Sequence, residues 1–193
     1  QDVAVVGDYA YVAHGDIGLM IIDKSDSTNP DLIGSYYTSN GMSDVTVAGI
    51  IGGGTAIASL TIYGNDIAID DIGDAGTRGV TAATAVTAYD GLADTGSISL
   101  TGTRYETDGS QTYDAQATNP ITIDGGGATE FETTSDTVAF TGLFDMNGQN
   151  VTVDTTNDAA VAGANITFNQ TIDDGGALVL DGGDIGNITV NGA

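Results

Sequence analysis

The chain has no cysteine and very few basic residues, and these absences exclude several classes of protein. Without cysteine it forms no disulfides, binds no zinc through thiolates and performs no thiol catalysis. The 193 residues include three Lys and Arg against 27 Asp and Glu, a formal net charge of −24. Recognition of phosphate groups requires a basic surface, so nucleic acid is not an expected partner. An anionic membrane surface is disfavoured for the same reason.

Long apolar runs and catalytic histidines are scarce as well. No apolar run approaches the roughly 18–20 residues that a membrane-spanning helix needs, so we expect no membrane insertion. His14 is the only histidine, which leaves no basis for a Ser–His–Asp arrangement. A polysaccharide lyase is a third possibility, but an acidic sugar would meet only three cations, Lys24, Arg78 and Arg104. We therefore expect no enzymatic activity and no required cofactor.

What the second half of the chain does contain is a repeated phrase, an Asn followed by a hydrophobic–Thr–hydrophobic triplet. Copies begin at Asn150, Asn165 and Asn187, and looser copies begin at Asn65 and Asn119. Alternation with period two predicts strands with one buried and one solvated face. Repetition of such strands between turns rich in Gly, Asp and Asn predicts a stacked, quasi-one-dimensional architecture.

The spacing of the strands favours one all-β architecture over another. Strand cores are predicted at Ile67/Ile69, Ile98/Leu100, Ile121/Ile123, Val138/Phe140, Val151/Val153, Ile166/Phe168, Leu178/Leu180 and Ile188/Val190. Their uneven spacing is consistent with two or three short strands in each coil of a parallel β-solenoid. A β-sandwich is the alternative. No helical pattern of useful length is present.

The N-terminal part has a different repeat. The motif at residues 2–7 returns at residues 44–49, and three further strand-like runs lie between the copies. The stretches 7–13, 18–23, 29–30 and 33–36 resemble one LVIVD repeat. That resemblance implies a four-stranded unit like a propeller blade, in large secreted or surface proteins of bacteria and archaea. We predict a blade-like unit over residues 1–49 and a solenoid over residues 50–193.

From Gly52 onward the sequence resembles filamentous-haemagglutinin-like and related giant bacterial adhesins. The phrases that carry this resemblance are residues 53–61, 109–115, 165–173 and 176–180. It implies a right-handed parallel β-solenoid on the cell surface. The chain begins at Gln1 and its repeats continue to Ala193, so we expect a segment of a longer protein. The expected role is a stiff extracellular stalk or a filament that assembles by self-association.

Clusters of Asp in Gly-rich turns indicate a possible Ca²⁺ site, because Ca²⁺ is bound by six to eight carboxylate and carbonyl oxygens. The candidate ligands are Asp70, Asp71, Asp74, Asp154, Asp158, Asp173, Asp174, Asp181 and Asp184. None of these clusters matches the EF-hand loop or the calcium-binding nonapeptide. Solvated turn acids are the alternative interpretation.

A second hypothesis makes the chain a binding module for carbohydrate or matrix. Aromatic and basic residues occur together at Tyr89, Arg104, Tyr105 and Tyr113, and a sugar would stack on the Tyr rings.

The Asn and Thr of the repeated phrase have structural interpretations. Asn tolerates a left-handed backbone and caps exposed amides, and stacked copies are able to form a ladder. Alternatively, Asn150, Asn165, Asn169 and Asn187 each start a glycosylation sequon. The central Thr residues are predicted to point outward and to line one flat, solvated face: Thr122, Thr152, Thr167 and Thr189. Ice-binding solenoids carry two Thr on each strand, and the apolar neighbours of these Thr disfavour that function.

Overall fold

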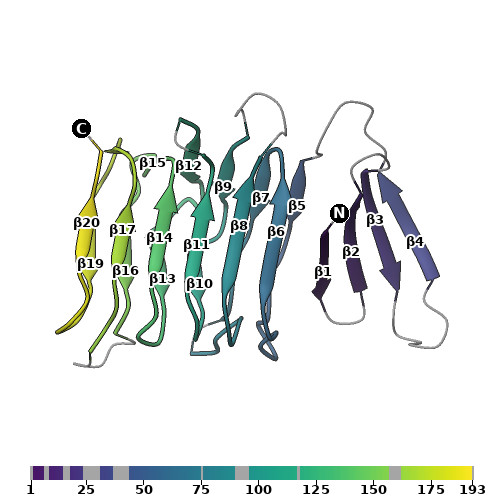
Figure 1. Cartoon of the computed structure of the whole chain (residues 1–193), viewed down its shortest axis with the longest axis horizontal. Helices are drawn as coiled ribbons and strands as arrows, with labels where there is room; N and C mark the ends of the chain where they lie inside the picture. Colours follow the sequence, from purple (N-terminus) through teal and green to yellow (C-terminus); the bar gives the residue numbers. More distant parts are fainter. Residues whose placement is uncertain are drawn as a thin grey trace.

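The protein is described by a computed structural model that contains strands and turns and no helix. It describes residues 2–6, 9–14, 18–23, 31–36, 44–74, 76–89, 96–116, 118–156 and 162–192. All of the statements about the structure below concern these residues. Two parts follow one another along the chain, a four-stranded sheet and a longer stack of coils (Figure 1).

The N-terminal part is an antiparallel meander, as the resemblance to a propeller blade implies. Its strands are β1 (Asp2–Val6), β2 (Tyr9–His14), β3 (Gly18–Asp23) and β4 (Asp31–Tyr36). They pair in the order β1-β2-β3-β4, each strand antiparallel to the next. Strand β1 lies against β6 of the coil stack without joining its ladder.

The remaining strands form a parallel β-solenoid with three sheets, which we number in the order that the chain meets them. Sheet 1 contains β5 (Val45–Val47), β7 (Ile67–Ile69), β9 (Ile98–Leu100), β12 (Pro120–Ile123), β15 (Leu143–Asp145) and β18 (Ile172–Asp173). Sheet 2 contains β10 (Arg104–Glu106), β13 (Thr129–Glu132), β16 (Val151–Asp154) and β19 (Leu178–Asp181). Sheet 3 contains β6 (Leu60–Gly64), β8 (Thr84–Ala88), β11 (Gln111–Asp114), β14 (Val138–Thr141), β17 (Ile166–Phe168) and β20 (Ile188–Val190).

One passage through the three sheets makes a coil, and about five turns lead from the first coil to the sixth. We number the coils by their first strands, from β5 in coil 1 to β18 in coil 6. The first two coils lack a full strand in sheet 2 and contribute the single bridge residues Ile51 and Ile72 there. Every pairing between coils is parallel, so the predicted solenoid is confirmed and the β-sandwich alternative is wrong.

Loops of different length explain the uneven spacing in the sequence. Equivalent residues of sheet 1 lie 22 positions apart between Val45 and Ile67, but 31 apart between Ile67 and Ile98. The additional residues extend the turns between strands, while the strands keep their register. Backbone hydrogen bonds from coil to coil therefore continue along the stack, which satisfies the polar groups of each strand.

The core is a column of inward-facing side chains, with aromatic rings in the middle coils. Tyr105 stacks on Phe131, and Phe140 stacks on both Tyr113 and Phe168, with ring centroids 4.9–5.4 Å apart. These five rings are 0–1 % exposed. Because aromatic side chains bury more apolar surface than other residues, these rings contribute strongly to the stability of the core.

The turns show why Gly, Asn and Thr recur. Gly52 has φ +70°, and a Cβ atom there would lie 2.1 Å from the carbonyl oxygen of Gly79 in the next coil, so only glycine fits. The backbone N–H of Asn187 donates to Oδ1 of Asn165 at 2.9 Å. The prediction that Asn caps an exposed amide is thus confirmed here, because the side chain of one coil accepts from the backbone of the next.

Two expectations from the sequence are wrong. Strand β5 pairs with β7 and belongs to sheet 1, so the boundary between the two parts lies before Asp44 and not after Gly49. The four central Thr residues do not share a face either. Thr122 lies on sheet 1, Thr152 on sheet 2, and Thr167 and Thr189 on sheet 3. The repeated phrase marks the start of a strand, and it does not specify the sheet which that strand joins.

Candidate functional site

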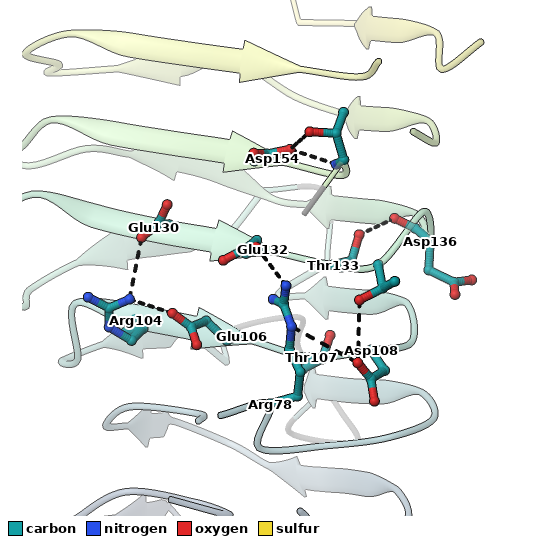
Figure 2. Close-up of polar contacts among 12 residues, drawn as sticks. Arg78, Arg104, Glu106, Thr107, Asp108, Glu130, Glu132, Thr133, Asp136 and Asp154 are labelled. Atoms are coloured by element: carbon teal, nitrogen blue, oxygen red, sulfur yellow. Dashed lines mark hydrogen bonds and ion pairs between the residues drawn. The ribbon is translucent and has the colours of Figure 1, made fainter. Parts of the chain in front are cut away.

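Sheet 2 carries most of the charged contacts in the solenoid. On its outward side, residues at equivalent positions of β10, β13, β16 and β19 are all acidic: Glu106, Glu132, Asp154 and Asp181. Neighbouring parallel strands lie about 4.8 Å apart, so these carboxylates form a column of closely spaced like charges. We call this column the acid ladder, and Figure 2 labels three of its members, Glu106, Glu132 and Asp154. Such a column repels itself unless cations are placed against it.

Arg104 supplies one of these cations. Its Nη1 donates to Oε1 of Glu106, and the same atom lies 3.6 Å from Oε2 of Glu130 in the next coil. The hydrogen bond to Glu106 raises the pKa of Arg104, and the charges of Glu106, Glu130 and Asp71 act in the same direction. Asp71 also accepts hydrogen bonds from the backbone N–H groups of Thr103 and Arg104, at 2.7 and 2.9 Å.

Arg78 supplies the second cation and spans three coils. It lies in the long turn of coil 2, and its Nη2 donates to Oε1 of Glu132 in coil 4 at 2.6 Å. On the way it passes Asp108 of coil 3, with 4.0 Å between Nε and Oδ1. The side chains of Arg78 and Glu132 are only 17 % and 10 % exposed. Figure 2 shows Arg78 lying across the turn towards Glu132.

Three threonines bridge the turns that lead from sheet 2 to sheet 3, directly after the acids of the ladder. Thr107, Thr133 and Thr155 follow β10, β13 and β16, and all three are fully buried. The hydroxyl of Thr107 donates to the carbonyl of Gly109, and the other two hydroxyls make the equivalent bond within their own coils. The sequence expectations missed this column, although a signal for it exists: residues 105–107, 131–133 and 153–155 share the pattern of an apolar residue, an acid and a Thr.

The chemistry that this arrangement supports is electrostatic clamping of neighbouring coils. Glu106, Glu132 and Asp154 are 3 %, 7 % and 8 % exposed, so a substrate has little access to their carboxylates. Two of them are held by arginines, and Asp154 accepts hydrogen bonds from the backbone N–H and the hydroxyl of Thr156 at 2.6 and 2.7 Å. Through these ion pairs the two arginines connect coils 2, 3 and 4.

The candidate calcium ligands are spread over several turns. Asp70 accepts from the backbone N–H of Gly49, Asp173 from that of Asp174 and Asp181 from that of Gly183. Asp158 lies outside the described residues. Within the described part of the chain, no group of three or more His, Cys, Asp or Glu side chains is placed to hold a metal ion. Calcium binding remains a prediction.

The hypothesis that a sugar stacks on Tyr105 and Tyr113 is wrong. Both rings lie in the core and are 0 % exposed, because their strand positions face inward. Arg104 faces outward but is held by Glu106 and Glu130, whereas Tyr89 is 45 % exposed at the end of β8. The four residues therefore form no common binding surface.

A shallow groove of about 560 Å³ lies on sheet 1 near the C-terminal end of the stack. Its lining combines apolar Leu143 with the acids Asp145, Asp173 and Asp174. Two of these acids are candidate calcium ligands. The groove is open to solvent and has no basic or aromatic anchor apart from the buried Phe144.

Comparison with known proteins identifies only the N-terminal part. Residues 1–38 match the LVIVD repeat family, which agrees with the resemblance seen in the sequence and with the four-stranded meander. No curated protein and no solved structure matches the chain. Among the described residues, no helix has the length and apolar character needed to cross a membrane. A segment that matches the LVIVD repeat is thus followed by a β-solenoid.

Proposed function

We propose that this chain is a structural segment of a large secreted or cell-surface protein and acts as a stiff stalk. The observation that carries this proposal is the unbroken coil-to-coil pairing of sheets 1 and 3 from coil 1 to coil 6. The arginine clamps add cross-links between coils 2, 3 and 4 on sheet 2. A rod of this kind holds an attached domain at a fixed distance from a surface.

The resemblance to filamentous-haemagglutinin-like adhesins supports placing this stalk in an extracellular adhesin or fibre. Surface labelling of intact source cells with an antibody against the chain tests the location. We expect labelling without permeabilisation and removal of the signal by added protease. Labelling that requires lysed cells would contradict the extracellular assignment.

A stalk and a binding module differ in whether the isolated chain binds extracellular polysaccharide or matrix. Beads coated with the full chain are expected to show no retention on extracellular polysaccharide or matrix beyond that of uncoated beads. Strong retention would instead favour the carbohydrate-binding alternative. Electron microscopy of the same material is expected to show short rods, and end-to-end filaments would extend the proposal to self-assembly.

Calcium is an optional part of this proposal. Thermal unfolding with added Ca²⁺ and with a chelator tests it, because an ion that binds only the folded chain raises the midpoint with concentration. An unchanged midpoint in both conditions would remove Ca²⁺ from the stalk.

A further inference from the structure

The two ends of sheet 3 differ in how well their inward side chains are covered. In coil 1, Leu60 and Ile62 of β6 are 3 % and 5 % exposed, and β1 of the meander lies against this strand. In coil 6, the equivalent inward residues Ile188 and Val190 of β20 are 47 % and 49 % exposed. One end of the sheet is therefore covered by another part of the chain, whereas the other end presents apolar surface.

The backbone of β20 is open at the same end. The carbonyl of Asn187 accepts the N–H of Ile166 at 3.0 Å, and the N–H of Asn191 also donates to β17, at 2.9 Å. Because alternate residues of β20 bond to β17, the N–H and C=O groups of Ile188 and Val190 point to the outer edge. No other strand among the described residues pairs with that edge. An edge of this kind is a template for a further strand.

The sequence around β20 is complementary to itself. From Asn187 to Asn191 it reads Asn, Ile, Thr, Val, Asn, which is nearly the same in both directions. An antiparallel pair of two such strands, centred on Thr189, places Asn opposite Asn, Ile188 opposite Val190, and Thr189 opposite Thr189 of the second copy. Directly opposed residues lie on one face of a sheet, so the apolar side chains of both copies face inward together.

The open backbone groups fit this arrangement. In an antiparallel ladder, hydrogen-bonded pairs alternate with pairs that exchange no backbone hydrogen bonds. The edge-facing groups of Ile188 and Val190 make these residues a hydrogen-bonded pair, in which each donates to and accepts from the other. The backbone groups of Thr189 point to β17, so it lies in the intervening pair, where two Thr side chains stabilise each other. A two-fold axis at Thr189 therefore satisfies the edge in both copies.

The distribution of charge also favours contact at this strand. No acid lies between Asn187 and Asn191, whereas the last strands of sheets 1 and 2 contain Asp173 and Asp181. A second copy, with a net charge of −24, thus meets less repulsion at β20 than at the other two edges of coil 6. The acids of two copies still repel one another at a distance, and salt screens this repulsion.

We propose that two copies of the chain join by antiparallel pairing of β20, so that sheet 3 continues from one copy into the other. The interface is isologous, and it closes after two copies because the meander lies against the other end of sheet 3. The result is a dimer and not an open-ended filament. This inference rests on the stalk proposed above and names its partner, since two solenoids joined at coil 6 form a rod of twice the length. Each copy contributes one short strand, so the dimer is weak and forms at high concentration.

Sedimentation equilibrium of the full chain at increasing concentration tests the association. We expect the mass to rise from one copy to two and no further, and added salt to strengthen the dimer. Val190→Pro removes an edge-facing N–H and leaves the bonds to β17 in place, a change that edge strands tolerate, and it should abolish the dimer. Unfolding curves of this variant and of the wild type confirm that both are folded.

Cysteine substitution tests the register, because the wild-type chain has no cysteine. In the intervening pair the two Cα atoms lie about 4.5 Å apart, within the range that a disulfide spans. Thr189→Cys should therefore form disulfide-linked dimers on mild air oxidation, at least an order of magnitude faster than Thr112→Cys. Thr112 provides the matched control, because it occupies the same outward column of sheet 3 in coil 3, away from the contact.

Hydrogen exchange at two protein concentrations follows β20 itself. In a dilute sample the copies are separate, and the amides of Ile188 and Val190 should exchange fast. In a concentrated sample these two amides should slow, because they then donate across the dimer. The amide of Thr189 bonds to β17 in both states and should change less.

Three results would overturn the dimer. The first is a chain that sediments as one copy at every concentration, which would leave the stalk without this partner. The second is growth beyond two copies, which would indicate head-to-tail assembly through coil 1. The third is cross-linking of Thr189→Cys and Thr112→Cys at equal rates, which would exclude the pairing centred on Thr189. The stalk fails on a different result, the absence of rods in electron micrographs.

Discussion

At the scale of single residues, the position of Arg78 has the clearest energetic consequence. Its partner Glu132 is 54 residues away in the sequence, and both side chains are largely buried. Removing the arginine leaves the carboxylate of Glu132 largely buried without its arginine counter-ion, which costs stability. Replacing both members by apolar residues removes that penalty.

We therefore expect Arg78→Met to lower the free energy of unfolding by about 3 kcal/mol, and Arg78→Met/Glu132→Met to recover most of that loss. Urea unfolding of the two variants and the wild type measures both values. A single variant within about 0.5 kcal/mol of the wild type, the size of an exposed surface pair, would show that the clamp is not important for stability.

The buried tyrosines define the behaviour of the protein at high pH. Desolvation raises the pKa of Tyr105 and of Tyr113 well above the usual value of 10.0. The folded state keeps these protons after the unfolded state has lost them, so the stability that they confer is complete below pH 10 and is lost as the pH rises further.

Unfolding free energies between pH 8 and pH 12 are expected to fall once the pH exceeds about 10. Tyr105→Phe should make this fall less steep, since one of the two protons responsible is then absent. Exposed Tyr63 provides the matched control, and Tyr63→Phe should leave the slope unchanged. The opposite ranking of the two slopes would contradict the burial of Tyr105.

At the scale of elements, coil-to-coil caps by Asn explain the repeated phrase. Asn150 Oδ1 accepts the backbone N–H of Ala177 at 2.8 Å, and Asn165 Oδ1 accepts that of Asn187 at 2.9 Å. The acid at the same place in earlier coils does the same, since Asp66 Oδ1 accepts the N–H of Ser97 at 3.0 Å. In these three places a short polar side chain before one strand therefore fixes the start of the strand in the next coil.

Asn150→Ala should destabilise the protein by about 1 kcal/mol, the net value of one hydrogen bond, whereas Asn150→Asp keeps the acceptor oxygen and should cost less. Asn187→Ala is the control within the same phrase, because coil 6 is the last coil among the described residues and the structure shows no backbone N–H in a further coil that Asn187 caps. Equal losses for Asn150→Ala and Asn187→Ala in thermal unfolding would refute the capping role.

At the scale of the whole molecule, burial differs along the stack. Inward residues of coils 3 to 5 such as Phe140 and Ile166 are fully buried, whereas Ile188 and Val190 of β20 are 47 % and 49 % exposed. These two residues occupy inward positions that Ile166 and Phe168 occupy in the preceding coil. Protection from local opening therefore decreases towards β20.

Hydrogen exchange is expected to show this gradient directly. Amides of β14 should exchange slowest and those of β20 fastest among the strands of sheet 3, because β14 has a coil on both sides and β20 on only one. Uniform protection from β11 to β20 would indicate that the last coil is covered by another molecule.

The sequence predicts the local features well. Alternation identifies Ile166 and Phe168 as inward residues, and the motifs between Asp2 and Tyr36 predict the four strands of the meander. These features follow from the chemistry of consecutive residues, because a strand alternates its faces with a period of exactly two. Calcium binding by the Asp residues of the turns stays a prediction.

The sites were predicted less well for a physical reason. The sequence predicted Tyr105 and Tyr113 as ligand-binding aromatics, but their inward positions place both rings in the core. There the hydroxyl of Tyr105 donates to the carbonyl of Ile69 at 3.1 Å. That partner lies 36 positions earlier, in the preceding coil. No local pattern records a contact whose sequence distance depends on loop length.

The sequence by itself determined that this protein is an acidic, all-β stack with capped turns, because alternation, turn residues and charge are properties of neighbouring residues or of composition. Only the tertiary structure decided which sheet each strand joins. It thereby separated Thr122 from Thr167 and brought Arg78 to Glu132. The reason is that coil-to-coil register depends on how far each loop extends, and several loops of different length and composition are compatible with the same strand pairing.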